Sequence, residues 1–335
     1  MERPKISVII AVFNAEKTLS RCLNSLVAQT LQEIEFICID DGSTDRSASI
    51  LDEYAGRDSR FKVFHKDNEG VSATRQFGHE HIYGDFFIHL DSDDYAEPQA
   101  YELLYNAAIA NSADIVICDA EQITINGAQK MDYFAEDLSA EALIKRMFSW
   151  ETSALWNRLI RTELITRYDL RFPHHLQLAE DCYFLSCLLN RSIRHDDHLI
   201  ITHVDKVLIH YDKTANTVSL SKLIGRKTIF KRMTDSYRLL IDELEPGIEI
   251  YGPSFYNFIT EMAFDAFWGA KKDKLSEQEF QTYFISFQNG IRKYATKGYR
   301  RTLVLLALCR GNRFANAFRW VAVPTILFDK IRSRN

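Results

Sequence analysis

The densest group of acidic side chains in the sequence is Asp91-Ser92-Asp93-Asp94, which follows the apolar run 86–90. Three carboxylates so close together repel one another unless a cation or a network of donors balances them. Mg²⁺ and Mn²⁺ prefer carboxylate oxygens and usually keep positions open for phosphate and water. The alternative is a solvated turn in which Asp93 or Asp94 caps the next helix. Because an apolar strand leads directly into the cluster, we favour a metal site.

Two other acidic pairs are candidates with weaker support. Asp41 lies in Asp40-Asp41-Gly42-Ser43, which is ordinary turn chemistry, although a carboxylate there could accept a hydrogen bond from the imide of a uracil base. Glu180 and Asp181 precede an apolar helix, where they could favour the helix dipole or supply a general base for a sugar hydroxyl. Arg75 could bind phosphate or lie on a helix face. The residues alone leave these alternatives open.

Other kinds of chemistry have no motif in the sequence. It contains neither GxGxxG nor GxxxxGK[ST], which argues against dinucleotide-binding and P-loop proteins. The ten histidines show no tight metal-ligand spacing, and only His203 and His210 are expected near a site edge. The six cysteines form no CxxC pair and are expected to be reduced thiols, mostly in the core.

Alternating strand and helix patterns predict the scaffold that positions these residues. Apolar runs predict strands, and the spacing of apolar residues over 19–27 predicts a helix. The expected strands are 5–11, 35–39, 61–65, 86–90, 115–118, 199–202 and 206–211, and further helices are expected after a Ser43 or Thr44 cap, over 98–110 and after 180. Such alternation is typical of an α/β fold with a largely parallel sheet covered on both faces. Ligands bind beyond the carboxyl ends of such strands, so the clusters at 40–45 and 91–94 are expected to share one edge.

Composition and charge bound the remaining possibilities. Of 335 residues, 46% are hydrophobic and 26% are charged, which predicts a folded core and excludes a disordered chain. We expect no secretory signal and no transmembrane helix, because the longest apolar runs are too short to span a bilayer. The net charge of −5 is divided unevenly, since residues 291–335 contain eleven Lys and Arg and one acid. This basic tail is expected either to meet an anionic membrane surface or to pack on the protein as a helical cap.

Four segments, in this order, resemble the inverting family 2 glycosyltransferases with the GT-A fold. They are Ile6-Ser7-Val8-Ile9-Ile10-Ala11-Val12-Phe13-Asn14, Asp40-Asp41-Gly42-Ser43-Thr44-Asp45, Asn68-Glu69-Gly70-Val71-Ser72-Ala73-Thr74-Arg75 and Leu90-Asp91-Ser92-Asp93-Asp94. A weaker likeness to bacterial cell-surface polysaccharide transferases continues through Trp156-Asn157-Arg158-Leu159 and Glu180-Asp181. The resemblance implies a GT-A domain over 1–220, with a nucleotide-binding half at about 1–120 and an acceptor half at about 121–220. Residues 221–335 are expected to form a helical C-terminal region.

The resemblance also implies roles for individual residues in the nucleotide half. Asp41 would bind the uracil of a UDP-sugar, and the backbone around Ala11 and Phe13 would line the nucleotide pocket. Asp91 would face the ribose and the metal, with Ser92 beside it. Arg75 would help to hold the nucleotide.

The catalytic assignments follow from the same resemblance. Asp93, together with Asp91, would ligate Mn²⁺ or Mg²⁺, and Asp181 would be the catalytic base, with Glu180 as the second candidate. One departure is Tyr211-Asp212-Lys213, where the family typically has Tyr-Arg. Lys213 could replace the missing guanidinium as a point charge.

These assignments predict a metal-dependent, inverting transfer of a sugar from a UDP-sugar to a hydroxyl of a growing surface glycan. A lipid-diphosphate-linked acceptor would place the protein in the cytoplasm at the inner face of the cell membrane. The alternatives are a nucleotidyltransferase that makes nucleotide sugars and a non-catalytic nucleotide- or glycan-binding module. A nucleic-acid partner is not expected, because no RNA- or DNA-binding motif precedes the basic tail.

Overall fold

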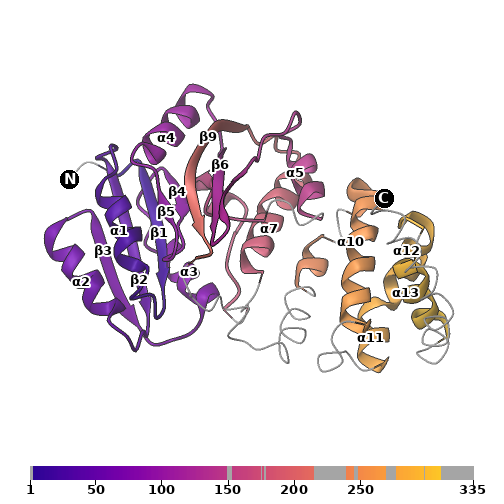
Figure 1. Ribbon diagram of the computed structural model, residues 1–335. Helices are drawn as coiled ribbons and strands as arrows, with labels where there is room; N and C mark the ends of the chain where they lie inside the picture. The colour runs from indigo at the N-terminus through magenta and orange to yellow at the C-terminus, as the bar shows by residue number, and fades with distance from the viewer. Residues whose placement is uncertain are drawn as a thin grey trace. The chain divides into compact units, whose positions relative to one another are not determined.

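The computed structural model describes residues 3–148, 153–174, 176, 179–214, 239–244, 248–268, 277–297 and 299–310. The chain divides into two compact units, Met1–Ser219 and Leu220–Asn335 (Figure 1). The first unit contains the predicted site residues.

The first unit is built around one mainly parallel sheet (Figure 1). Its described strands are β1 (Ile6–Val12), β2 (Ile34–Asp41), β3 (Phe61–Lys66), β4 (Phe86–His89), β5 (Tyr95–Ala96), β6 (Ile115–Thr124), β7 (Gly127–Met131), β8 (Arg158–Arg161) and β9 (Ile201–Asp212). They lie in the order β3-β2-β1-β4-β8-β6-β9-β5, and β7 pairs with β6 outside this path. Strands β1 to β4 pair in parallel, whereas β8 runs antiparallel to both β4 and β6.

Helices cover both faces of this sheet. The described helices are α1 (Leu19–Val27), α2 (Ser47–Arg57), α3 (Val71–His79), α4 (Ala100–Ala110), α5 (Ala140–Met147), α6 (Glu163–Arg167) and α7 (Glu180–Arg194). Phe86 and Phe87 are neighbours on β4 and therefore point to opposite faces. Phe86 lies against Tyr105 of α4, with ring centroids 6.0 Å apart, and Phe87 lies against Phe184 of α7 at 6.2 Å. The expected α/β architecture is confirmed.

Two parts of the sheet differ from the expectations. Residues 120–170, over which no strand was expected, contain the end of β6 and the strands β7 and β8. The segments 199–202 and 206–211, expected as two strands, form the single strand β9. Its register against β6 shifts on either side of Asp119, so a bulge absorbs the residues that seemed to separate two strands.

The start of α2 is also corrected. The helix begins at Ser47, and neither Ser43 nor Thr44 caps it. The Asp45 carboxylate accepts a hydrogen bond from the Ser47 N–H at 2.9 Å, while Ser43 and Thr44 bond to Asn14. The polar residues 43–45 therefore link the loop after β2 to the loop after β1, and only Asp45 bonds to the start of α2.

The described part of the second unit is helical. It contains α10 (Ile248–Trp268), α11 (Glu277–Phe284), a short 3₁₀ helix (Ile285–Phe287), α12 (Gln288–Tyr294) and α13 (Tyr299–Arg310). The backbone of α10 is non-helical at Gly252, which has φ +48°, and Pro253 follows this kink. Among the residues with described placement, none of the helices has the length and apolarity that crossing a membrane requires. The basic tail beyond residue 310 lies outside the described residues.

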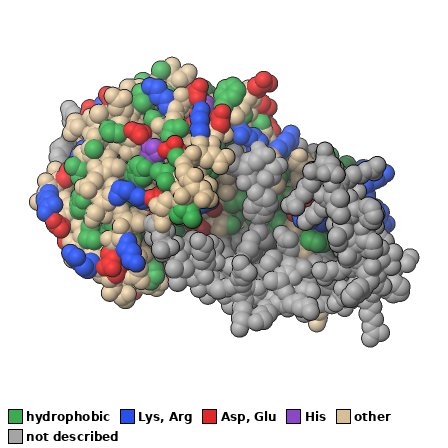
Figure 2. All heavy atoms as spheres, viewed as in Figure 1, with side chains coloured by type: hydrophobic (Ala, Val, Ile, Leu, Met, Phe, Trp, Pro, Cys, Tyr) green, Lys and Arg blue, Asp and Glu red, His purple; other side chains and the backbone are tan. Residues whose placement is uncertain are grey.

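Charges of both signs are mixed over the first unit on the face that Figure 2 shows. Lys and Arg side chains lie beside Asp and Glu side chains across this face, between patches of hydrophobic and neutral surface. This described face therefore resembles an ordinary solvated surface.

Candidate functional site

The carboxyl ends of β1, β2 and β4 form one edge of the sheet. β1 is hydrogen-bonded to β2 on one side and to β4 on the other, and all three run in parallel. Ala11 and Phe13 lie where β1 ends, Asp41 is the last residue of β2, and Asp91 and Ser92 follow β4. Phe13 is 39% exposed. The topology thus places five of the six predicted nucleotide-sugar residues along a common edge, while the sixth, Arg75, lies on α3.

Asp41 is buried and organises the turn before α3. Its Oδ1 accepts hydrogen bonds from Lys66 Nζ at 2.7 Å and from the backbone N–H of Glu69 at 3.0 Å. Its Oδ2 accepts from the N–H of Gly70 at 2.8 Å. A uracil imide would have to share oxygens that already serve this turn.

Gly42 lets the chain pass close to that turn. It has φ +70°, and a Cβ added to it would lie 2.8 Å from the backbone nitrogen of Asn68. Only glycine adopts such a conformation at this distance without strain. The glycine of the Asp-Asp-Gly-Ser motif is therefore required by the fold of the edge itself.

Arg75 connects two acidic motifs that are far apart in the sequence, 91–94 and 180–181. It lies on α3, and its Nη2 donates to Asp91 Oδ1 at 2.9 Å while Nη1 donates to Glu180 Oε1 at 2.7 Å. Although burial opposes its charge, Glu180 and Asp91 raise the pKa of the Arg75 guanidinium. A buried guanidinium that bridges two carboxylates is a strong, directional link. It joins the end of β4 to the start of α7.

Helix α3 also holds the segment that leads into α7. Ser72 Oγ donates to the carbonyl oxygen of Pro173 at 2.7 Å, and the N–H of Phe172 donates to Gln76 Oε1 at 3.0 Å. The same helix therefore begins at the Asp41 turn, carries Arg75 and positions the approach to Glu180-Asp181.

Asp181, in the first turn of α7, has the acid–base properties that a proton acceptor needs. Burial, and then the neighbouring Glu180 carboxylate, raise the pKa of Asp181 to about 7, while Arg75 opposes the rise. A general base is most effective when its pKa is near the working pH. Ala179, two residues before it, has φ +59°, a left-handed conformation that is uncommon for residues other than glycine. Such strained positions cluster at functional sites.

The turn after β4 divides its carboxylates into a buried one and two that reach the surface. Asp94 is fully buried, and its Oδ1 accepts a hydrogen bond from the N–H of Asp212 at 3.0 Å. Burial, and then Asp91 and Asp93, raise the pKa of Asp94 well above its ordinary value. Neither Asp93 nor Asp94 caps a helix, since α4 begins at Ala100. Asp91 and Asp93 are partly exposed and are the carboxylates that a ligand could reach.

Lys213 and His210, whose roles were open, have partners within the protein. Lys213 Nζ donates to Gln122 Oε1 at 3.0 Å. The His210 ring lies 2.7 Å from a Glu97 carboxylate oxygen and 3.1 Å from one of Glu121. These contacts fasten β9 to its neighbours.

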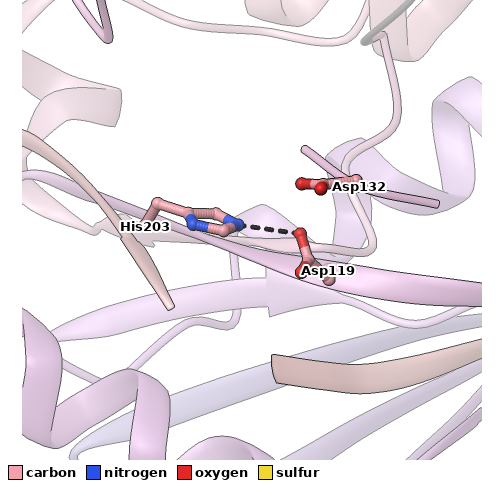
Figure 3. Close-up of side chains that lie close together, drawn as sticks. All are labelled: Asp119, Asp132 and His203. Carbon is pink, nitrogen blue, oxygen red and sulfur yellow. Dashed lines mark hydrogen bonds and ion pairs between the residues drawn. The ribbon is translucent and has the colours of Figure 1, made fainter. Parts of the chain in front are cut away.

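A second cluster of potential metal ligands lies on β6, on β9 and directly after β7. The donor atoms of Asp119, Asp132 and His203 all lie within 4.8 Å of one another, and Figure 3 shows Asp132 near the pair formed by His203 and Asp119. His203 Nε2 is 2.8 Å from Asp119 Oδ1, and Asp119 is completely buried. These donors could hold a divalent cation. The Lys130 ammonium, 2.8 Å from Asp119 Oδ2, already supplies a positive charge there, so a metal ion would have to compete with it.

Comparisons with known proteins identify a matching family model and relatives that are named as glycosyltransferases. Residues 7–165 match the family model described as Glycosyl transferase family 2. The chain is 37% identical to the putative glycosyltransferase EpsH of Bacillus subtilis over 234 residues. The aligned residues cover 68% of this chain and 64% of EpsH. It is 33% identical to an uncharacterized glycosyltransferase of Haemophilus influenzae over 197 residues, which cover 56% of this chain and 73% of that protein. The alignment with EpsH thus leaves more than a third of EpsH unmatched.

The solved structure of residues 1–349 of S. aureus TarS has the same fold. It superposes with a TM-score of 0.69 and 22% identity, and the match covers 92% of this chain and 88% of the TarS chain. Its complex with UDP-GlcNAc matches with a TM-score of 0.66 and 20% identity, covering 92% of this chain and 88% of that chain. The similarity confirms the GT-A fold expected from the four sequence segments.

Proposed function

Because the chain belongs to glycosyl transferase family 2, we propose that it transfers a sugar from a UDP-sugar to a hydroxyl of a growing surface glycan, with inversion at the anomeric carbon. The single observation that carries the proposal is the Arg75 bridge. It joins Asp91, at the edge where the donor would bind, to Glu180, which is adjacent to the proposed base. A donor and an acceptor hydroxyl could therefore meet within one rigidly connected set of residues. The TarS complex with UDP-GlcNAc supports a UDP-sugar as donor.

The donor would lie along the edge formed by β1, β2 and β4. The backbone near Ala11 and Phe13 and the Asp41 carboxylate would contact the nucleoside, and Asp91, with Ser92, would approach the ribose. Arg75 acts through Asp91, because the contacts described above direct its guanidinium to carboxylates. We assign it a part in positioning the nucleotide site.

Asp93 and Asp91 would hold a divalent cation beside the diphosphate. The donor set fits, since both side chains are partly exposed and the Arg75 bond to Asp91 uses only its Oδ1. A bound Mn²⁺ or Mg²⁺ would neutralise charge that develops on the departing diphosphate. The Asp119-Asp132-His203 cluster is the competing location for such an ion.

Asp181 would accept the proton of the attacking hydroxyl. At pH 7 a carboxyl group whose pKa is about 7 is ionised in roughly half of the molecules, so the base form is available and the protonated form is also stable. Attack from the face opposite the diphosphate inverts the anomeric centre, and the transition state has oxocarbenium character. Glu180, held by Arg75, tunes this base and is the less suitable acceptor.

A lipid-diphosphate-linked acceptor would bring the protein to the inner face of the membrane. Arg292, Lys293 and Lys297 are exposed and could meet anionic lipid, although Arg292 Nη2 also donates to Cys309 Sγ at 3.3 Å. Arg300, by contrast, pairs with Glu261, and Arg301 donates to the carbonyl oxygen of Ile291 at 3.1 Å, so part of the basic tail holds the helical unit together. Flotation with phosphatidylglycerol vesicles, compared with phosphatidylcholine vesicles, tests the membrane contact. Equal recovery on both would rule it out.

A donor screen tests the enzymatic proposal. The release of UDP is measured with UDP-Glc, UDP-Gal, UDP-GlcNAc and UDP-GalNAc, with and without Mn²⁺. We expect one donor to be hydrolysed slowly without acceptor, and Asp181→Asn to reduce turnover by about 10²- to 10⁴-fold while UDP still binds. Pyrophosphate formation from a sugar phosphate and UTP would instead identify a nucleotidyltransferase. Binding of UDP without turnover of any donor would identify a binding module.

A further inference from the structure

One side of α1 lies along the turn that carries Asp91 and Asp93. Arg21 Nη2 donates to the carbonyl oxygen of Asp93 at 2.7 Å, and Ser25 Oγ accepts a hydrogen bond from the N–H of Ala96 at 3.2 Å. Arg21 and Ser25 are four residues apart, so they project from the same face of the helix. The helix therefore contacts the turn at two points.

Arg21 makes the most extensive of these contacts. Its Nη1 forms an ion pair with Asp212, which is at the end of β9 and almost completely buried. Its guanidinium also lies over the Tyr95 ring, 4.9 Å from the centroid. One side chain thus joins α1, the turn after β4, the strand β5 and the end of β9.

The negative charge around the Arg21 guanidinium explains why a cation is needed there. Asp91, Asp93, Asp94 and Asp212 converge on one short turn, and such carboxylates would push the turn open without a compensating cation. Arg21 is 42% exposed on its side chain, so it is not a core residue that merely fills space. A planar guanidinium can hold two acceptors and stack on a ring at once, which a lysine ammonium cannot do.

We propose that Arg21 is a positioning residue that holds the turn 91–94 in the geometry that binds the divalent cation. It acts by bonding the Asp93 carbonyl and the Asp212 carboxylate together, and it does not touch the sugar. Groups that orient metal-binding residues from outside the coordination sphere typically change metal affinity by about 10- to 100-fold when they are removed. The assignment rests on the proposed function for the identity of the cation.

Hydrogen exchange of the full-length, metal-free protein tests the positioning directly. In Arg21→Ala and Arg21→Lys, the amides of Asp94 and Ala96 should exchange about tenfold faster than in the wild type. Both variants lose the charge-assisted hydrogen bonds of the guanidinium to the turn, and the turn should therefore open more often. Arg57→Ala is the matched control, because Arg57 is an exposed arginine on α2 whose ion pair is with Glu53. Unchanged exchange in both Arg21 variants would overturn the assignment.

Binding of Mn²⁺ in the presence of UDP, followed by the electron paramagnetic resonance signal of the free ion, tests the consequence. We expect both Arg21 variants to bind Mn²⁺ about tenfold or more weakly, and Arg57→Ala to bind it as the wild type does. Wild-type affinity in Arg21→Lys would show that charge alone suffices and would refute the positioning role. If the wild type binds no Mn²⁺, both proposals fail, whereas Mn²⁺ binding without UDP release from any donor overturns only the proposed function.

Discussion

Replacing Asp181 with asparagine is expected to stabilise the protein at neutral and alkaline pH while reducing transfer by about 10²- to 10⁴-fold. Burial and Glu180 raise the pKa of the Asp181 carboxyl to about 7 from an ordinary value of 3.8. The folded state therefore binds the proton more tightly than the unfolded state does. It follows that this group makes the wild type progressively less stable as the pH rises from about 4 to about 7. Asparagine does not titrate and is free of this loss.

The magnitude follows from the size of the pKa rise. The rise from 3.8 to about 7 is close to three pKa units, and each unit corresponds to about 1.36 kcal/mol. At pH 8 the ionised carboxylate thus destabilises the fold by at most about 4 kcal/mol. At pH 4 the carboxyl is protonated in the folded state and only partly ionised in the unfolded state, so the variant gains little from this source. The expected gain of Asp181→Asn is therefore near zero at pH 4 and largest above pH 7.

Urea unfolding of the wild type and of Asp181→Asn at pH 4, 5, 6, 7 and 8 measures this difference. Asp67→Asn is the matched control, because Asp67 is exposed and its substitution should leave the pH dependence unchanged. A difference between variant and wild type that does not grow with pH would show that the Asp181 pKa is not raised. A variant less stable than the wild type at pH 8 would show that its carboxylate is stabilised by the fold, contrary to the reasoning above.

Three further outcomes are expected. Glu180→Gln removes a carboxylate that raises the pKa of Asp181, so the acidic limb of the pH–kcat profile should move to lower pH by about one unit; an unmoved limb would exclude this coupling. Asp93→Asn should raise the Mn²⁺ concentration needed for half-maximal UDP release by tenfold or more, whereas His203→Ala should leave it unchanged, and the reverse result would transfer the metal to the Asp119-Asp132-His203 cluster. Gly42→Ala should lower the free energy of unfolding by about 1–2 kcal/mol, because it places a Cβ in a left-handed conformation 2.8 Å from a backbone nitrogen, and equal urea midpoints would contradict this.

The common edge of the site could be predicted because it depends on local patterns. The strands that lead to Asp41 and Asp91 are short and mostly apolar, and polar residues follow each of them closely. Parallel pairing then brings their ends together without any knowledge of distant contacts. The same reasoning does not show which direction each carboxylate faces, and Asp41 illustrates this because its oxygens serve the turn before α3.

The elements that were missed depend on pairing between distant residues. β8 is only four residues long and lies antiparallel between β4 and β6, so its strand conformation is set by its neighbours and not by its own sequence. The Asp119–His203 contact depends on the register of β6 against β9, which a bulge shifts next to Asp119. A sequence pattern read segment by segment contains no signal for either feature. That Asp119 and His203 are neighbours could be predicted only once the pairing of β6 with β9 was known.

The two arginines of the site show what charge balance adds to sequence reasoning. Arg75 on α3 pairs with Asp91 and Glu180, and Arg21 on α1 pairs with Asp212 and bonds the Asp93 carbonyl. Neither arginine belongs to an acidic motif, and each is by itself an ordinary helix residue. Carboxylates gathered at one sheet edge nevertheless require compensating charge wherever solvent is excluded. The helices beside that edge can supply this positive charge. An acidic cluster at strand ends therefore predicts that arginines on those helices pair with it. The two guanidinium groups neutralise part of the negative charge at this edge, and a divalent cation would neutralise more of it. Removing either arginine should therefore weaken the binding of the cation as well as the ion pairs that the arginine itself forms.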